Sequence, residues 1–172
     1  MTPEFSRPIR LDTIGETARV ITIEADDQER TALARRFGLV RLDRLDAEGA
    51  IRRDGEIMFV EGRLRAAVTQ SCVASGEPVD ATVDAPFSLR FVPEAGDLPV
   101  EIELQVEDCD TLSYAGGAID LGEAVAETLA LSLDPYPRSP DAETVLKAAG
   151  VVAEDEAGPF AALKALRDKL GG

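Results

Sequence analysis

The chain has 172 residues, of which 45% are hydrophobic and 30% charged, a balance that is typical of a globular protein and excludes a disordered one. It contains no apolar run of the roughly 18 residues that a membrane span needs and begins without the features of a signal peptide, so we expect a cytoplasmic protein. There is no histidine, which removes the most common general base and the most common zinc ligand.

The net charge of −15 is divided unequally along the chain. Residues 1–70 hold 12 arginines and 13 acidic residues, whereas residues 71–172 hold 6 basic and 20 acidic residues. Because nucleic-acid phosphates are bound chiefly through Lys and Arg, the second half should repel them. The first half remains open to such contact.

The first predicted elements are a strand and a short helix. Residues 19–24 are rich in β-branched side chains, which favour a strand. Asp26 or Asp27 can then cap a helix over about residues 28–37, and Gly38 is a suitable residue to end it. The acidic first turn and basic last turn of this segment agree with the helix dipole.

The middle of the chain predicts an antiparallel sheet. Residues 39–51 favour a strand, but their alternation breaks near Arg44 and Leu45, which suggests a bulge or an irregular edge. Residues 58–72 and 79–91 alternate cleanly between apolar and polar side chains, and a turn over residues 75–78 separates them, so we expect the two to pair. This alternation places Cys72 on the core side.

A further strand is predicted over residues 100–107, where the outward positions form a row of carboxylates. We interpret Glu101, Glu103 and Glu107 as an acidic face for a partner. A helix should follow over residues 121–133, capped by Asp120 and ended by the prolines after residue 134.

The C-terminal part predicts a short helix over about residues 141–149, an acidic linker over 151–158 and an amphipathic helix over 159–172. The last helix either folds back onto the core or docks into a groove of a partner. The fold class is therefore α+β: an antiparallel sheet that can curl into a barrel, one helix near the N-terminus, and two to three helices in the C-terminal third. Residues 1–150 are expected to form a single domain.

No motif indicates catalysis or cofactor binding. Serine-nucleophile, phosphate-loop and dinucleotide motifs are absent from the sequence, and the acidic stretch after Asp108 lacks the ligand spacing of an EF-hand. Cys72 and Cys109 have no histidine to activate them, and we interpret Cys72 as a buried structural cysteine. We therefore expect no catalytic residue, no cofactor, no metal and no small-molecule substrate.

Arginines gather on the first helix and the strand after it, and they are candidates for contact with RNA or a partner. The alternative is a solvated face neutralised by nearby carboxylates. The residues are Arg30, Arg35, Arg36, Arg41, Arg44, Arg52 and Arg53.

Four short motifs follow one another along the chain, at residues 72–79, at 119–123 with Glu127 on the following helix, at 134–138 and at 158–163. Taken in this order, they resemble the YceD family, and the similarity covers nearly the whole chain. The family-motif positions are Cys72, Glu77, Pro78, Asp120, Glu127, Pro135, Tyr136, Pro137, Arg138 and Phe160.

The resemblance implies a role in biogenesis of the large ribosomal subunit, supporting accumulation or processing of its main RNA, with no enzymatic activity. Many members carry Cys-x-x-Cys at the turn where this chain has Ser75 in place of the second cysteine. A lone Cys72 cannot supply a tetrahedral zinc site, so no zinc role is expected here.

Three functional hypotheses follow. The first is contact between the acidic surface and a large-subunit ribosomal protein or a pre-ribosomal particle, since ribosomal proteins are basic. The second is direct binding of ribosomal RNA through the arginine-rich first half. The third is an enzyme with an unrecognised carboxylate site, which would need a pocket with two convergent acids.

Overall fold

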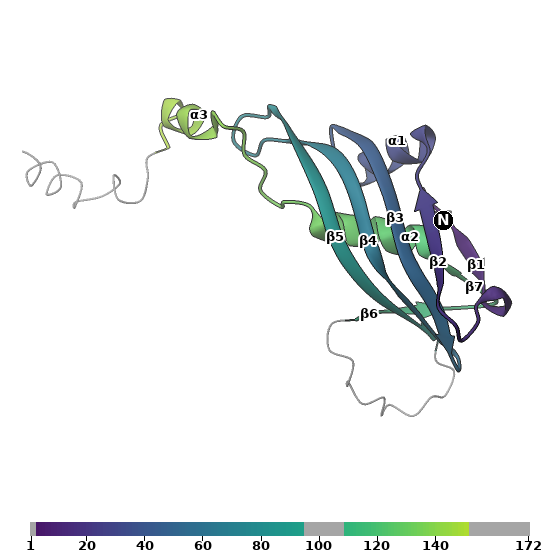
Figure 1. Ribbon diagram of the computed structural model, residues 1–172. Helices are drawn as coiled ribbons and strands as arrows, with labels where there is room; N and C mark the ends of the chain where they lie inside the picture. Colours follow the sequence, from purple (N-terminus) through teal and green to yellow (C-terminus); the bar gives the residue numbers. More distant parts are fainter. Residues whose placement is uncertain (1–2, 95–108, 152–172) are drawn as a thin grey trace, which may run out of the picture. The chain divides into compact units, whose positions relative to one another are not determined.

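The computed structural model describes residues 3–94 and 109–151 (Figure 1). The elements in chain order are β1 (Pro8–Arg10), a 3₁₀ turn (Leu11–Thr13), β2 (Arg19–Glu24), α1 (Asp27–Arg36), β3 (Arg41–Asp54), β4 (Ile57–Ser71), β5 (Pro78–Pro93), β6 (Asp110–Tyr114), β7 (Ala118–Asp120), α2 (Leu121–Ser132) and α3 (Ala142–Ala148). The predicted α+β class is confirmed. The predicted strand over 100–107 and the segments 152–158 and 159–172 lie outside the described residues.

The main sheet has five strands in the order β2-β3-β4-β5-β6, and β1 pairs with β7 in a separate antiparallel pair. The pairs β2–β3 and β3–β4 are antiparallel; a tight hairpin turn joins β3 to β4, whereas α1 connects β2 to β3. β6, in contrast, runs parallel to β5 over residues 89–93. Among the described strands β2 and β6 are the two edges, so the sheet is open and the barrel alternative is not realised.

The broken alternation in β3 is a β-bulge. The register with β4 shifts between Leu42, which faces Val68, and Arg44, which faces Ala67. The extra residue changes the parity of the strand, so that Leu42 and Leu45, three positions apart, are both buried. The sequence interpretation of this region is confirmed.

Each of the two helices of the sheet unit is preceded by a capping aspartate. The Asp26 carboxylate accepts the backbone N–H groups of Gln28 and Glu29 at 2.8 and 2.9 Å, and the Glu29 side chain returns to the Asp26 N–H at 2.8 Å. Asp120 caps α2 by accepting the N–H of Glu123 at 3.2 Å. The predicted positions of both N-termini are therefore confirmed.

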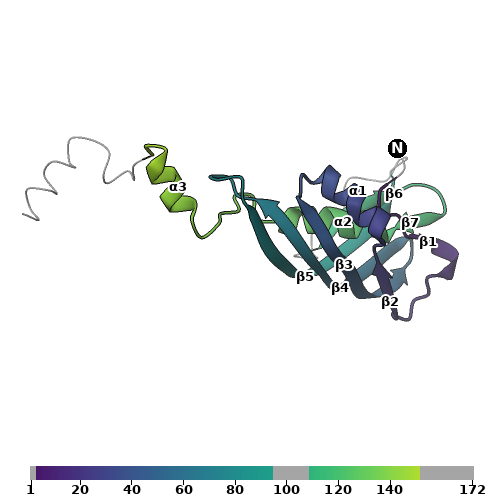
Figure 2. The same ribbon diagram turned by 90° about the horizontal axis from the view of Figure 1, so that it is seen from above.

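The core lies between the sheet and these helices, which are on the same side of it in both views (Figures 1 and 2). Leu33 of α1 and Val125 and Leu129 of α2 are fully buried against inward residues of the strands, such as Leu45 and Leu64. The alternation of β3, β4 and β5 thus supplies one apolar face, and the helical stripes cover it.

The segment before β1 is held against the start of α2. Phe5 is fully buried, and its carbonyl lies so close to Gly122 that a side chain there would collide with it. Asp120 accepts the backbone N–H of Arg7 at 2.8 Å and the hydroxyl of Ser6 at 2.5 Å. One aspartate therefore caps the helix and fixes this segment.

The chain divides into two compact units. The sheet unit comprises Met1–Gln70 and Asp80–Pro135, and the second unit comprises Ser71–Val79 and Tyr136–Gly172. The predicted boundary near residue 150 stays a prediction. None of the helices in the described ranges is long and apolar enough to cross a membrane.

Candidate functional site

The structure places the candidate arginines on α1 and β3 and gives most of them partners. Arg30 pairs with Asp27, Arg44 with Asp46, and Arg41 with Asp43 at 2.7 Å. These contacts are local in sequence and lie largely in solvent, where each contributes little to stability. Their main consequence is that several positive charges of this half are already balanced.

Arg36 makes the most extensive ion pairs of the group. Its guanidinium donates to Glu123 of α2 at 2.7 and 2.9 Å and to Glu4 at 2.9 Å. The hydrogen bonds to Glu123, together with the smaller contribution of Glu4, raise the pKa of Arg36 above its ordinary value. This arginine therefore links α1, α2 and the N-terminal segment, a role that the sequence did not reveal.

A second ion pair of this type joins Arg7 to Glu29 at 2.6 Å. The Arg7 hydrogen bond lowers the pKa of Glu29, and the same carboxylate completes the capping box of α1. Sequence reasoning missed these ion pairs because their members lie 22 to 87 positions apart, on elements whose packing the sequence does not show. They connect elements and are not arranged to receive a ligand.

Arg35 differs from its neighbours on α1, because its guanidinium makes no hydrogen bond or ion pair within residues 3–94 and 109–151, and only its carbonyl is engaged, by the Gly38 N–H at 3.4 Å. It lines a shallow depression between α1 and the start of β3, together with Arg30, Arg41 and the exposed Val40. Three arginines thus line one hollow, and two of them, Arg30 and Arg41, are already paired with carboxylates. Arg52 lies apart, stacked over the Phe59 ring at 4.4 Å, and Arg53 donates to the carbonyl of Gly55 at 2.6 Å.

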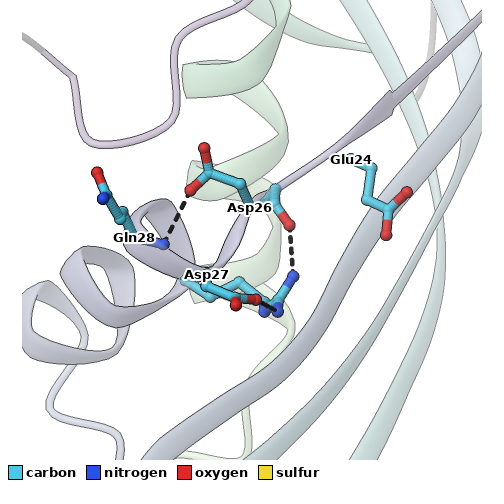
Figure 3. A pocket seen from close by; sticks show the side chains of 6 residues that line it. Glu24, Asp26, Asp27 and Gln28 are labelled. Carbon is cyan, nitrogen blue, oxygen red and sulfur yellow. Dashed lines mark hydrogen bonds and ion pairs between the residues drawn. The ribbon is translucent and has the colours of Figure 1, made fainter.

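A second hollow lies at the N-terminus of α1 and is lined by acidic side chains (Figure 3). In the close-up, Asp26 accepts from the backbone of Gln28, and Arg30 donates to Asp27 and, at 2.6 Å, to the carbonyl of Ala25. The carboxylate of Glu24 points away from the Asp26 carboxylate (Figure 3). Asp26 caps the helix, Asp27 pairs with Arg30, and Glu24 points elsewhere, so the acids of this hollow do not converge on one point as an acid–base pair would.

In the second unit, Cys72 lies immediately after β4 and is only 3% exposed, which confirms that its side chain is buried as predicted. Its sulfur accepts the backbone N–H of Ser139 at 3.2 Å and that of Ser75 at 3.4 Å, and the two serine hydroxyls lie 3.3 Å apart. The Ser139 N–H, followed by the side chains of Ser75 and Ser139, lowers the pKa of the thiol to about 6. The sulfur thus joins two segments 67 residues apart.

This cluster does not fit the zinc site that a Cys-x-x-Cys motif would imply. It offers one thiol and two neutral hydroxyls, whereas structural zinc requires four ligands, mainly thiolates and imidazoles. No group of three potential metal-ligating side chains occurs in residues 3–94 and 109–151. Hydrogen bonds to the Cys72 sulfur hold this turn.

The family-motif positions mostly build local structure. Glu77 accepts the N–H of Cys72 through its carbonyl at 2.7 Å, Pro137 accepts that of Val73 at 2.9 Å, and Pro78 begins β5. Glu127, Pro135, Tyr136 and Arg138 are exposed, whereas Pro137 is buried. Phe160 and the acidic face of Glu101, Glu103 and Glu107 lie outside the described residues.

The described residues form an open α+β sheet unit and a turn held by hydrogen bonds to a cysteine sulfur, in a chain with a net charge of −15. The family model described as "Large ribosomal RNA subunit accumulation protein YceD" matches residues 60–167, more than half of the chain. The chain therefore belongs to the YceD family, and the resemblance stated from its motifs is confirmed. Searches of curated proteins and of solved structures gave no match.

Proposed function

We propose that the protein is a non-enzymatic, cytoplasmic accessory factor in large ribosomal subunit biogenesis. It supports accumulation or processing of large-subunit ribosomal RNA by presenting an acidic surface to a basic ribosomal protein or a pre-ribosomal particle. The family description supports the process, and the net charge of −15 supports the kind of partner. The acidic face proposed for this contact comprises Glu101, Glu103 and Glu107.

The observation that carries the proposal is the pairing of the arginines. Arg36, Arg41 and Arg44 each contact carboxylates of the same sheet unit. Arg36 compensates Glu123, near the end of the acidic stretch from residue 94 to 127, whereas Arg41 and Arg44 pair with Asp43 and Asp46 outside it. The stretch itself contains no basic residue. A surface of this sign attracts basic protein and repels exposed phosphate.

The test is sedimentation of the tagged protein with ribosomal precursors in cell extracts at low and high salt. We expect association with large-subunit precursors at low salt and its loss at high salt, because the contact is between charged surfaces. A variant with Glu101, Glu103 and Glu107 changed to Gln should dissociate at lower salt. A control with Glu154→Gln, Asp155→Asn and Glu156→Gln makes the same charge change and should behave as wild type. Absence of any association at low salt would contradict the proposal.

A second candidate, direct contact with ribosomal RNA, is favoured by the depression that Arg30, Arg35 and Arg41 line. Arg35 is the residue to change, because Arg36 holds two carboxylates and its loss would disturb folding. Arg35→Glu should abolish binding of a large-subunit RNA fragment while leaving the unfolding temperature unchanged. Arg19→Glu, on the exposed strand β2, is the matched control. Equal RNA binding by wild type and Arg35→Glu would remove this candidate.

A further inference from the structure

The outer face of the sheet carries a hollow that no described helix covers. α1 and α2 both lie on the other side of the sheet (Figures 1 and 2). The hollow has a volume of about 320 Å³ and is lined by residues of β2, β3 and β4. These strands and the segments that join them all lie within residues 3–94, so described residues set the shape of this outer-face hollow.

The pairing of the strands gives the outer-face hollow an apolar floor. Val20 of β2 lies opposite Ala50 of β3, and Ala50 lies opposite Glu61 of β4. Ile51 and Val60, the next residues along β3 and β4, are fully buried, so alternation turns Ala50 and Glu61 outward. Val20 is 71% exposed beside them. Its side chain and that of Ala50 form the floor.

Two glutamates border this floor, and their carboxylates are free of partners within residues 3–94 and 109–151. Glu61 belongs to the row of side chains just described, and Glu48 lies two positions before Ala50 on the same outward face. Both side chains are exposed, and neither carboxylate makes a hydrogen bond or ion pair with a described residue. Negative charge therefore remains beside an apolar surface.

The arginines at the rim of the outer-face hollow contact other carboxylates. Arg63 lies opposite Glu48 but donates to Asp84 at 2.9 Å. Arg65 lies 3.8 Å from Asp46. The cations of the rim are thus directed to neighbouring aspartates, and the two glutamates remain available to a cation from outside.

We propose that the outer-face hollow receives a lysine or arginine side chain of a basic protein. The methylene stem of the guest would lie on Val20 and Ala50, and its charged head would lie between Glu48 and Glu61. A short cation would gain only the charge contact, and an apolar side chain only the floor. The inference rests on the proposed function, because it assigns a described surface to contact with a basic ribosomal protein.

The charge of the chain favours a foreign partner over a second copy. Each copy has a net charge of −15, so two copies repel one another. A basic protein is attracted by the same field. The occupant of the outer-face hollow is therefore a basic side chain of another protein.

The test uses the purified full-length chain and a capped heptapeptide in which Lys alternates with Gly. A second peptide replaces each Lys with diaminobutyric acid, which keeps the charge and shortens the stem by two methylenes. In nuclear magnetic resonance titrations, the Lys peptide should shift the methyl signals of Val20 and Ala50 and the amide signals of Glu48 and Glu61. The short peptide should bind about fivefold more weakly, because it cannot cover the apolar floor.

Three variants separate the charge contact from the floor. Glu48→Gln combined with Glu61→Gln should weaken binding of the Lys peptide about fivefold at low salt. Asp54→Asn combined with Glu56→Gln makes the same charge change at the exposed β3–β4 turn and should bind as wild type. Val20→Thr keeps the shape of the side chain and should remove most of the difference between the two peptides. All these side chains are exposed, so urea unfolding should show unchanged stability.

Equal affinity of the two peptides for the wild type, full affinity of the double glutamine variant, or shifts centred on other acidic residues would overturn the inference. Shifts at this face that grow with protein concentration in the absence of peptide would also overturn it, because a second copy would then occupy the hollow. The peptide test uses no ribosome, and the sedimentation test leaves Glu48 and Glu61 unchanged, so failure of either is distinguishable from failure of the other.

Discussion

Gly122 of α2 provides a test in which local propensity and tertiary packing predict opposite signs. A Cβ atom at this position would lie 2.5 Å from the carbonyl oxygen of Phe5, 2.8 Å from the nitrogen of Arg7 and 3.1 Å from the carbonyl carbon of Phe5. All three atoms are backbone, so no side-chain rotation can relieve the collision. Gly122→Ala must displace the N-terminal segment or the helix.

The magnitude follows from the contacts at stake. Alanine is favoured over glycine inside a helix by about 1 kcal/mol. Against this, displacement would break the hydrogen bonds from the Arg7 N–H to Asp120 and from the Leu121 N–H to the Arg7 carbonyl, at about 1 kcal/mol each. Overpacking adds about 1–3 kcal/mol. We therefore expect a net destabilisation of about 2–4 kcal/mol.

The assay is urea unfolding, with the free energy extrapolated to water and the slope compared between variants. Gly117→Ala is the control, because nothing lies within 4 Å of its Cβ position, and we expect it to change stability by less than about 0.5 kcal/mol. In a Phe5→Ala background the segment is already loosened, so the cost of Gly122→Ala should shrink. A Gly122→Ala variant as stable as the wild type or more stable would refute the reasoning.

Three further outcomes are expected. Asp26→Ala removes the cap of α1 and should lower the free energy of unfolding by about 1 kcal/mol, whereas Asp26→Asn should lower it less. Gly62→Ala places a Cβ against the carbonyl of Glu48 and the buried Phe87 ring, and should lower the melting temperature by more than Asp26→Ala does. The Cys72 thiol, with its pKa lowered to about 6 from 9.0, should show thiolate absorbance that rises with a midpoint near pH 6, absent in Cys72→Ser. Because the folded-state pKa lies below the unfolded value, ionisation stabilises the fold fully above pH 9, and this stabilisation is lost as the pH falls through about 6.

The elements of the sheet unit could be predicted because their signals are local. The alternation of β4 and β5, the break in β3 and the aspartates before α1 and α2 each express a preference of a few neighbouring residues. β1 and β7, with three residues each, are too short for alternation to mark them. They exist because Ile9 and Ile119 are buried in the core and the two strands supply each other's hydrogen bonds.

The candidate site was less predictable, because its properties depend on contacts distant in sequence. The sequence offered Arg36 as a free cation, yet packing of α1 beside α2 pairs it with Glu123. Ser139 was not considered at all, although its N–H is the main cause of the lowered pKa of Cys72. The hydrophobic pattern of the sequence does not show which of several arginines pairs with a carboxylate, because the pairing depends on how the helices cross and on the register of the strands.

The same dependence explains why net charge alone does not identify a binding surface. The arginines that made the first half nearly neutral are mostly paired within the sheet unit, so they do not form the uniform basic face that RNA binding would use. The same holds for the carboxylates of β5. Asp80 accepts the Thr69 hydroxyl at 2.6 Å and lies 3.8 Å from Arg41, and Asp84 pairs with Arg63 at 2.9 Å. A carboxylate that already contacts a cation of its own unit attracts a basic partner less than its formal charge suggests, so the surface potential depends on which charges the fold brings together.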